Sequence, residues 1–183
     1  MGTDLTNTPL EELKGLRIRS LHDSRLTEKI RVIDGQCLLV KYKDEYYDTY
    51  VRNQLHVYNL VAYYHDLLVG SLTCRLEPVE NTENTYKLYI MTICVLEPYR
   101  HMKIGTRMLL KILDTASKEK RFPLESVTLH MQVGSPVLNF YQQFGFEVVK
   151  EVKDYYNDLD VRDALLLRKE VVQATEGGKK KKK

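Results

Sequence analysis

Residues 87–110 contain the pattern that most restricts how this chain can fold. A run of apolar and β-favouring residues over 85–96 predicts a buried strand. A short loop with Arg100 and Gly105 follows, and 104–120 then shows the spacing of an amphipathic helix. The expected inner stripe of this helix is Ile104, Met108, Leu109, Ile112 and Leu113. The first amides of a helix have no partners within it and lie at its positive end, so this junction suits a pyrophosphate.

The rest of the chain predicts further strands and helices around this unit. Strands are expected over 16–21, 57–64, 67–76, 126–132, 146–155 and 162–169, and helices over 23–34, 44–53 and 136–144. Asp23 or Ser24 suits a helix N-cap, Gly35 and Gly145 suit helix ends, and His65-Asp66 suits a hairpin turn. This order of elements is typical of a three-layer α/β domain.

Length and charge limit the domain organisation. A chain of 183 residues predicts one domain, which we place at 16–172 between a flexible lead-in at 1–15 and a disordered lysine-rich tail at 173–183. The formal charge of +3 depends on the tail, because 179–183 are five lysines. Without them, 23 basic residues (28 less five) stand against 25 acidic ones. This near-neutral balance argues against nucleic-acid binding by the folded domain.

The cysteines indicate a reducing compartment. Cys37, Cys74 and Cys94 are odd in number, far apart and without a CxxC pair, so we expect free thiols rather than disulfides or a metal site. No apolar run is long enough for a membrane span, and no signal peptide is expected. The predicted location is the cytoplasm, with the nucleus also open.

Several segments resemble one enzyme family. Leu88-Tyr89-Ile90-Met91-Thr92, Tyr99-Arg100, Leu129-His130-Met131-Gln132 and Phe144-Gly145-Phe146 are similar to segments of the GNAT acetyltransferases, and especially of the catalytic subunits of the NatE type. The resemblance extends from about residue 17 to 170. It implies the GNAT fold, a mixed and mostly antiparallel sheet of about seven strands with helices on both faces. It also implies transfer of an acetyl group from acetyl-CoA to the N-terminal amine of proteins.

The resemblance assigns a catalytic pair to Tyr89 and His130. An α-amine has a pKa of about 8, so a base must remove a proton near neutral pH, and histidine is suited to this. An isolated His130 would be interpreted as a strand-end histidine; the surrounding segment implies a base that acts with Tyr89 through an ordered water. Tyr141 matches the tyrosine beside the CoA sulfur. A backbone amide near Ile93 would polarise the thioester carbonyl.

The implied acetyl-CoA site combines a strand edge and a helix start, and no metal is expected. Ile93, Cys94 and Val95 would pair with the pantetheine amides. The pyrophosphate would lie on the 100–106 segment, and Ser135, Asn139 and Tyr141 would complete the site. The residues of that segment are Arg100, His101, Met102, Lys103, Ile104, Gly105 and Thr106.

Two departures from the family pattern affect this site. Lys103 stands where the family has glycine. A lysine in a right-handed conformation could place its ammonium on a phosphate, or it could block the cradle. The loop 133–136 is one residue shorter than usual and lacks an asparagine, and Ser135 is expected to cap the next helix with Pro136 in its first turn.

The implied acceptor slot has aromatic walls. Tyr155 and Tyr156 would hold the substrate backbone, Val40 and Tyr42 would form the opposite wall, and Met91 the floor. The NatE type prefers an initiator methionine followed by an apolar residue. Leu38-Leu39 replaces Phe-Pro of that type, so this loop lacks the fixed φ of proline.

Two other functions remain open at this point. The altered Lys103 and the missing asparagine favour a non-catalytic subunit that docks on the ribosome-bound NatA complex. The third hypothesis is acetylation of lysine side chains, whose pKa of about 10.4 demands a stronger base. The lysines 179–183 suggest either a contact with ribosomal RNA or a solubilising end without a defined partner.

Overall fold

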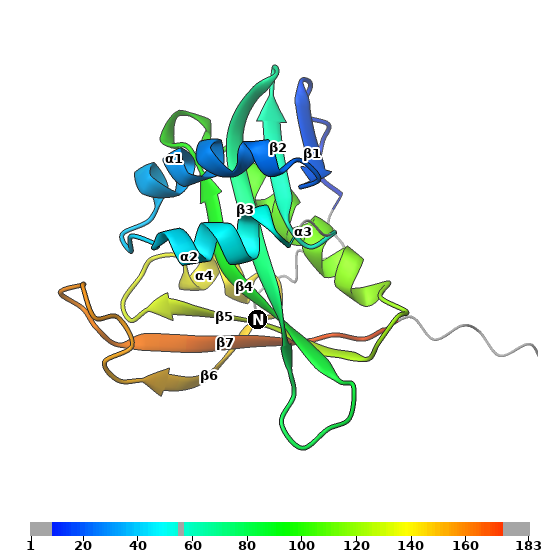
Figure 1. The fold of residues 1–183 in the computed structure, drawn as a ribbon, viewed down its shortest axis with the longest axis vertical. Helices are drawn as coiled ribbons and strands as arrows, with labels where there is room; N and C mark the ends of the chain where they lie inside the picture. Colours follow the sequence, from blue (N-terminus) through cyan, green and yellow to red (C-terminus); the bar gives the residue numbers. More distant parts are fainter. Residues whose placement is uncertain (1–8, 55–56, 174–183) are drawn as a thin grey trace, which may run out of the picture.

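The computed structural model describes residues 9–54 and 57–173. Its centre is a seven-stranded sheet in the order β1-β2-β3-β4-β5-β7-β6. β4 and β5 run parallel, and the other neighbouring strands are antiparallel. The expected mixed sheet with helices on both faces is confirmed (Figure 1). Residues 1–8 of the expected lead-in and 174–183 of the expected tail lie outside the described residues.

The strands and helices alternate broadly as the sequence predicts. The strands are β1 (Leu16–Ser20), β2 (Leu60–Tyr64), β3 (Leu67–Pro78), β4 (Tyr86–Val95), β5 (Leu124–Gln132), β6 (Glu147–Val152) and β7 (Ala164–Glu170). The helices are α1 (Thr27–Cys37), α2 (Asp44–Tyr46), α3 (Ile104–Ser117) and α4 (Leu138–Gln142), with 3-10 turns at Ser24–Leu26 and Glu97–Tyr99 and a π-helix at Tyr47–Arg52.

Two hydrophobic clusters cover the two faces of the sheet. The larger one contains the apolar face of α3, whose predicted stripe of Ile104, Met108, Leu109, Ile112 and Leu113 is buried. α4 adds Tyr141 to it, with Phe144 and Phe146 just beyond. The smaller cluster joins α1, α2 and the π-helix through Ile30, Tyr46, Tyr47 and Val51. Figure 1 shows α1 and α2 in front of the sheet and α3 behind it.

The hairpin between β2 and β3 follows its sequence signal. His65 and Asp66 both have positive φ, 45° and 68°, as a two-residue turn with the twist of the strands requires. Tyr64 therefore pairs with Leu67. Further along β3, Gly70 lies so close to β4 that a Cβ would meet the Cys94 carbonyl oxygen at 2.7 Å. A larger residue would push β4 away at the point where it borders the cavity described below.

Several predicted boundaries are wrong. Gly35 does not end α1, because its φ is not positive and the helix continues to Cys37. The helix predicted over 44–53 becomes a π-helix after Tyr46. β2 begins at Leu60 rather than at 57, and β6 ends at Val152, before a turn in which Asp154 has a φ of 50°. The start of β2 follows from hydrogen bonds between segments that periodicity does not connect.

Asn59 fixes one of these boundaries. This fully buried side chain donates from Nδ2 to the Tyr50 and Gln54 carbonyl oxygens, at 2.8 and 3.0 Å. Its Oδ1 accepts from the Cys74 amide at 2.8 Å. Cys74 lies where the register between β3 and β4 shifts. Asn59 thus connects the end of the π-helix to the irregular point of the central strands.

The feature that positions the site is the separation of β4 from β5. Their ladder pairs only Tyr86–Tyr89 with residues 124–128. β4 continues to Val95 and β5 to Gln132, so both strands have an unpaired edge beyond this ladder. On its other side, β4 pairs with β3, and the register shift leaves Met91 without a partner. A wedge therefore opens inside the sheet.

Candidate active site

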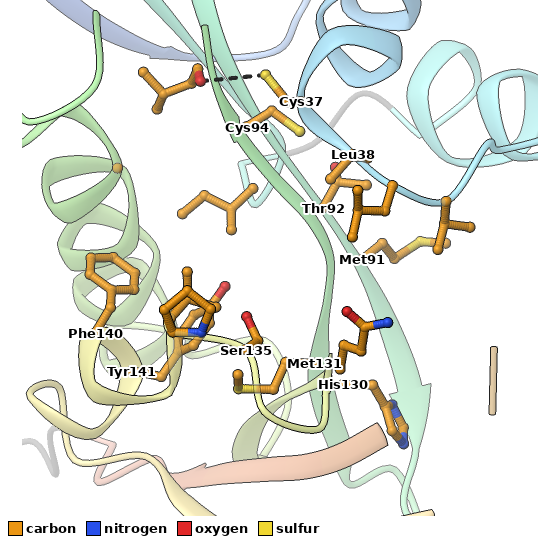
Figure 2. A pocket seen from close by; sticks show the side chains of 18 of the residues that line it. Cys37, Leu38, Met91, Thr92, Cys94, His130, Met131, Ser135, Phe140 and Tyr141 are labelled. Atoms are coloured by element: carbon orange, nitrogen blue, oxygen red, sulfur yellow. Dashed lines mark hydrogen bonds between the residues drawn. The ribbon is translucent and has the colours of Figure 1, made fainter. Parts of the chain in front are cut away.

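A cavity of about 970 Å³ occupies this wedge. Its walls come from β4, the start of α3, the end of β5, α4 and four loops, which lie after α1, β4, β5 and β6 (Figure 2). Most predicted site residues line it, although they are far apart in the sequence. They are Val40, Tyr42, Tyr89, Met91, Ile93, Cys94, Val95, Arg100, His101, Lys103, Ile104, Gly105, Thr106, His130, Ser135, Tyr141, Tyr155 and Tyr156.

Two predicted site residues do not line the cavity. Met102 packs against the large hydrophobic cluster, and Asn139 is exposed on α4. The structure also adds lining residues that sequence reasoning missed as a site: Cys37, Leu38, Leu39, Thr92, Tyr99, Met131, Gln132, Pro136, Val137, Phe140 and Leu159. Leu159 lies in an irregular segment without periodicity, and Cys37 follows a helix end that was placed too early. Neither residue carried a signal that could have placed it here.

The predicted catalytic pair is in direct contact. The Tyr89 hydroxyl lies 3.0 Å from His130 Nδ1. It also lies 3.0 Å from the Tyr155 hydroxyl, and the Tyr155 ring stacks on the His130 ring at 4.2 Å. Tyr155, predicted to hold the substrate backbone, thus contacts both members of the pair. β4, β5 and the loop after β6 each supply one member of this triad.

Burial sets the protonation states of the pair. The pKa of His130 is lowered, chiefly because burial disfavours the imidazolium ion; the Glu77 carboxylate opposes this shift, and nearby lysine and arginine charges add to it. Burial raises the pKa of Tyr89 well above its ordinary value. The Arg75 guanidinium lies over the Tyr89 ring at 4.6 Å. At neutral pH, His130 is therefore a neutral imidazole and Tyr89 a neutral phenol.

The start of α3 forms an anion cradle. The first hydrogen bond of the helix runs from the Arg107 amide to the Lys103 carbonyl oxygen at 3.0 Å, so the amides of Ile104, Gly105 and Thr106 precede the helical ladder. A Cβ added to Gly105 would meet only a Val95 methyl at 3.9 Å. The space beside this glycine therefore belongs to the cavity, which it lines.

The backbone of the cradle is left-handed at two residues. Lys103 has a φ of 61° and His101 a φ of 65°, so the right-handed conformation that was one alternative for Lys103 does not occur. The chain keeps the left-handed geometry that glycine adopts more easily. The Arg100 Nε donates to the Val95 carbonyl oxygen at 3.0 Å, which holds this side chain beside β4. Lys103 and Arg100 both line the cavity.

The predicted strand edge and its neighbours are in place. Ile93, Cys94 and Val95 lie beyond the paired part of β4, on the wedge. Tyr141 is 6% exposed, and burial raises its pKa, so its hydroxyl remains protonated. Ser135 lines the cavity, but α4 begins at Leu138 with Val137 at its N-cap and no side-chain cap. The predicted capping role of Ser135 is therefore wrong.

The predicted acceptor slot has a defined wall. The Tyr42 hydroxyl donates to the Met91 carbonyl oxygen at 3.1 Å and so connects the 38–42 loop to the unpaired residue of β4. Tyr155 and Tyr156 meet edge to face at 4.9 Å, and the Tyr156 amide donates to the Arg162 carbonyl oxygen at 2.9 Å. Burial raises the pKa of Tyr156 to about 12. The slot is therefore lined by neutral hydroxyls and apolar rings.

No group of three or more metal-ligating side chains occurs within residues 9–54 and 57–173. Over the same residues, no helix has the length and apolar character needed to cross a membrane.

Comparison with known proteins identifies the family. Residues 25–146 match the model of the "Acetyltransferase (GNAT) family". The chain is 38% identical over 133 residues to N-alpha-acetyltransferase 50 of Danio rerio, which covers 71% of this chain and 74% of the relative. It is 39% identical over 132 residues to the probable N-acetyltransferase san of Drosophila melanogaster, covering 71% and 67%.

A solved structure supports the same assignment. Arabidopsis thaliana Naa50 in complex with the bisubstrate analogue CoA-Ac-MVNAL matches with a TM-score of 0.74 and 30% identity, over 85% of this chain and 98% of that one. The chain belongs to the GNAT family of acetyltransferases.

Proposed function

We propose that this protein is an N-alpha-acetyltransferase, which transfers an acetyl group from acetyl-CoA to the N-terminal amine of polypeptides. One observation carries this proposal. The hydrogen-bonded Tyr89–His130 pair and the anion cradle of α3 line one and the same cavity. The relatives named N-alpha-acetyltransferase 50 and san support the same activity.

The residues of the cavity fit a CoA thioester. The three amides at the start of α3, with Arg100 and Lys103 nearby, suit the pyrophosphate. The unpaired edge of β4 at Ile93 to Val95 suits the two amides of the pantetheine arm. When bound, acetyl-CoA supplies an activated acyl group on a thiol that leaves once it is protonated. The Tyr141 hydroxyl, held neutral by burial, is the proton donor that we assign to this thiol.

His130 acts as the general base in this proposal. A neutral imidazole at neutral pH can accept a proton, and its Nδ1 is bonded to the Tyr89 hydroxyl. Tyr89 has too high a pKa to act as a phenolate. It therefore passes a proton, receiving one from the substrate amine, directly or through a water, while donating its own to His130. Tyr155 positions both groups through its hydroxyl and its ring.

The slot favours an N-terminal methionine followed by an apolar residue. Met91, Tyr42 and Tyr156 give it apolar walls with hydroxyl tips, and no carboxylate lines the cavity among the described residues to hold a basic side chain. The analogue bound to the Arabidopsis relative contains the sequence MVNAL, which begins with methionine. We place the enzyme in the cytoplasm, on N-termini of nascent or finished chains.

A peptide panel tests the proposal. Peptides starting with Met-Leu, Met-Lys and Ser-Leu are incubated with the enzyme and acetyl-CoA, and the acetylated residue is located by fragmentation mass spectrometry. A second version of each peptide has a blocked N-terminus and one internal lysine. We expect acetylation of the free N-terminus of Met-Leu peptides. Acetylation confined to the internal lysine would instead establish a lysine acetyltransferase.

The second candidate is a non-catalytic subunit of a larger acetyltransferase complex, and the left-handed Lys103 in the cradle is the observation that favours it. Calorimetric titration with acetyl-CoA separates the two. Micromolar binding supports the enzyme. If the folded protein does not bind acetyl-CoA, the result would instead support a non-catalytic subunit that docks on the NatA complex or the ribosome.

A further inference from the structure

Two cysteine thiols meet in the wall of the cavity, where the proposed reaction does not use them. Cys37 is the last residue of α1, and Cys94 lies on β4. Figure 2 shows their sulfur atoms on adjoining sides of the same space. Both residues line the cavity and both are free thiols. The Cys37 thiol donates to the carbonyl oxygen of Val95, the residue after Cys94 on β4. Small molecules that enter the cavity can therefore reach the half-buried Cys37, whereas Cys94 lies behind it, 1% exposed.

The surroundings of Cys37 favour a reactive thiol. Its Sγ lies 3.4 Å from the Val95 carbonyl oxygen, which also accepts from the Arg100 Nε. The hydrogen bond with the Cys94 thiol, and then the Arg100 guanidinium, lower the pKa of Cys37 to about 7 against the opposing effect of burial. A large fraction of Cys37 is therefore thiolate at neutral pH, and the thiolate is the nucleophile of cysteine chemistry.

The surroundings of Cys94 keep its thiol protonated. Cys94 is 1% exposed, and the neighbouring Cys37, burial and the nearby Asp34 carboxylate all raise its pKa well above the ordinary value. Asp34 lies one turn before Cys37 on α1 and is 2% exposed. One of its carboxylate oxygens accepts from Ser71 Oγ at 3.4 Å, and the other is buried without a partner. Cys37 is therefore the nucleophile of the pair, and Cys94 is its protonated partner.

We propose that Cys37 and Cys94 form a thiol–disulfide pair that reacts with disulfides of small anionic thiols entering the cavity. Cys37 attacks one sulfur of the small disulfide, forming a mixed disulfide and releasing one thiol. Cys94 then attacks the Cys37 sulfur, forming the Cys37–Cys94 disulfide, and its proton leaves with the second small thiol. Two protein thiols are oxidised, and one small disulfide is reduced to two thiols.

The position of the pair predicts what the disulfide does. It would join the end of α1 to β4, next to the Val95 carbonyl and the Arg100 side chain at the cradle. The 38–42 loop, which leaves α1 directly after Cys37, forms one wall of the acceptor slot. Oxidation would therefore fix both ends of the cavity in one arrangement and reduce acetyl-CoA binding. This last consequence rests on the proposed function, whereas the thiol chemistry does not.

Intact mass spectrometry of the full chain tests the chemistry. The reduced protein is incubated at neutral pH with CoA disulfide or, in a parallel arm, with glutathione disulfide. We expect the wild type to lose about 2 Da, for the two hydrogens of one disulfide, and to recover on addition of a thiol reductant. Cys94→Ser should stop at the mixed disulfide on Cys37, and Cys37→Ser should gain neither product. The faster arm identifies which small disulfide the cavity admits.

Cys74 provides the internal control. It is fully buried, and burial raises its pKa, so peptide mapping should find it unmodified in every arm. Cys74→Ala should react as the wild type does. The proposal is overturned if the wild type keeps all its thiols, or if Cys37→Ser still forms the disulfide or an adduct. Acetyl-CoA titration of oxidised and reduced protein then measures the effect on binding, so a failed acetyltransferase assay does not alter the thiol result.

Discussion

The side chains of Tyr89, His130 and Tyr155 hold one another in place. The Tyr89 hydroxyl has two partners at 3.0 Å, and the Tyr155 ring stacks on His130, so none of the three side chains is free to turn. The sequence predicted the first two as a pair, because a resemblance connected two distant segments. It did not predict that Tyr155 holds the pair, since that contact depends on the turn after β6.

The depressed pKa of His130 predicts the acid limb of the reaction. Burial lowers this pKa below the ordinary 6.5, so the imidazole stays neutral until the pH falls below that value. We divide the kcat/KM of the wild type by that of His130→Ala at each pH. The ionisation of the substrate amine affects both enzymes equally, so it cancels in this ratio. We expect a ratio of about 100 or more at neutral pH that falls only below pH 6.5. A ratio that already declines above that pH would contradict the assignment.

Substitutions of Lys103 separate the effect of its charge on acetyl-CoA binding from the effect of its backbone conformation on stability. Its φ of 61° is costly for lysine and easy for glycine. If the ammonium binds phosphate, Lys103→Ala and Lys103→Gly should both weaken acetyl-CoA binding by about fivefold at low salt, for a contact of ~1 kcal/mol. Lys103→Gly should in addition raise the melting temperature relative to Lys103→Ala. Tighter binding by both variants, measured by calorimetry, would mean that the lysine obstructs the cradle.

At the scale of elements, local sequence patterns predicted whether a segment is a helix or a strand better than they predicted where it begins and ends. The α3 stripe is correct because one amphipathic helix packs on one sheet face, and the His65-Asp66 turn is correct because two residues determine it. α1 and β2 begin or end elsewhere because distant contacts decide their limits. The π-helix at Tyr47–Arg52 has no distinctive pattern, since its extra residue per turn follows from packing on the sheet.

Asn59 is the residue on which one such boundary depends. We expect Asn59→Ala to lower the free energy of unfolding by about 3 kcal/mol, because it removes three hydrogen bonds and leaves the buried Cys74 amide without an acceptor. Chemical denaturation measures this, and the exposed Asn157→Ala serves as the matched control with an expected change near zero. Equal stability of the two variants would show that the connection contributes nothing.

At the scale of the molecule, the resemblance predicted the site better than periodicity predicted the fold. Most of the predicted site residues line one cavity, although they come from six separate segments. Cys37 and Leu159 were not predicted as site residues, because their positions depend on where a helix ends and on how a loop folds back. The limits of the domain stay a prediction, although Leu13 packs on the core and Gln173 donates to the Glu119 carbonyl oxygen at 3.0 Å.

The five lysines at 179–183 lie outside the described residues, so their prediction depends on charge alone. Deleting them should weaken co-sedimentation with ribosomes at low salt and leave turnover of free peptides unchanged. Replacing all five with arginine keeps the charge and should keep the co-sedimentation, whereas replacing them with glutamine should weaken it as much as deletion does. Unchanged co-sedimentation after deletion would leave the tail without a role at the ribosome.

The wedge between β4 and β5 has a further consequence for what the molecule avoids. Unpaired strand edges normally invite strands from other molecules and promote aggregation. Here both edges face each other within one sheet and converge on the paired residues at Tyr86–Tyr89. Side chains of α3 and α4 line the same cavity, so a strand from another molecule would have to displace them to pair with either edge. A single extended chain with a few amides can instead lie along β4. The fold therefore offers strand hydrogen bonds to a ligand without exposing an edge that promotes aggregation.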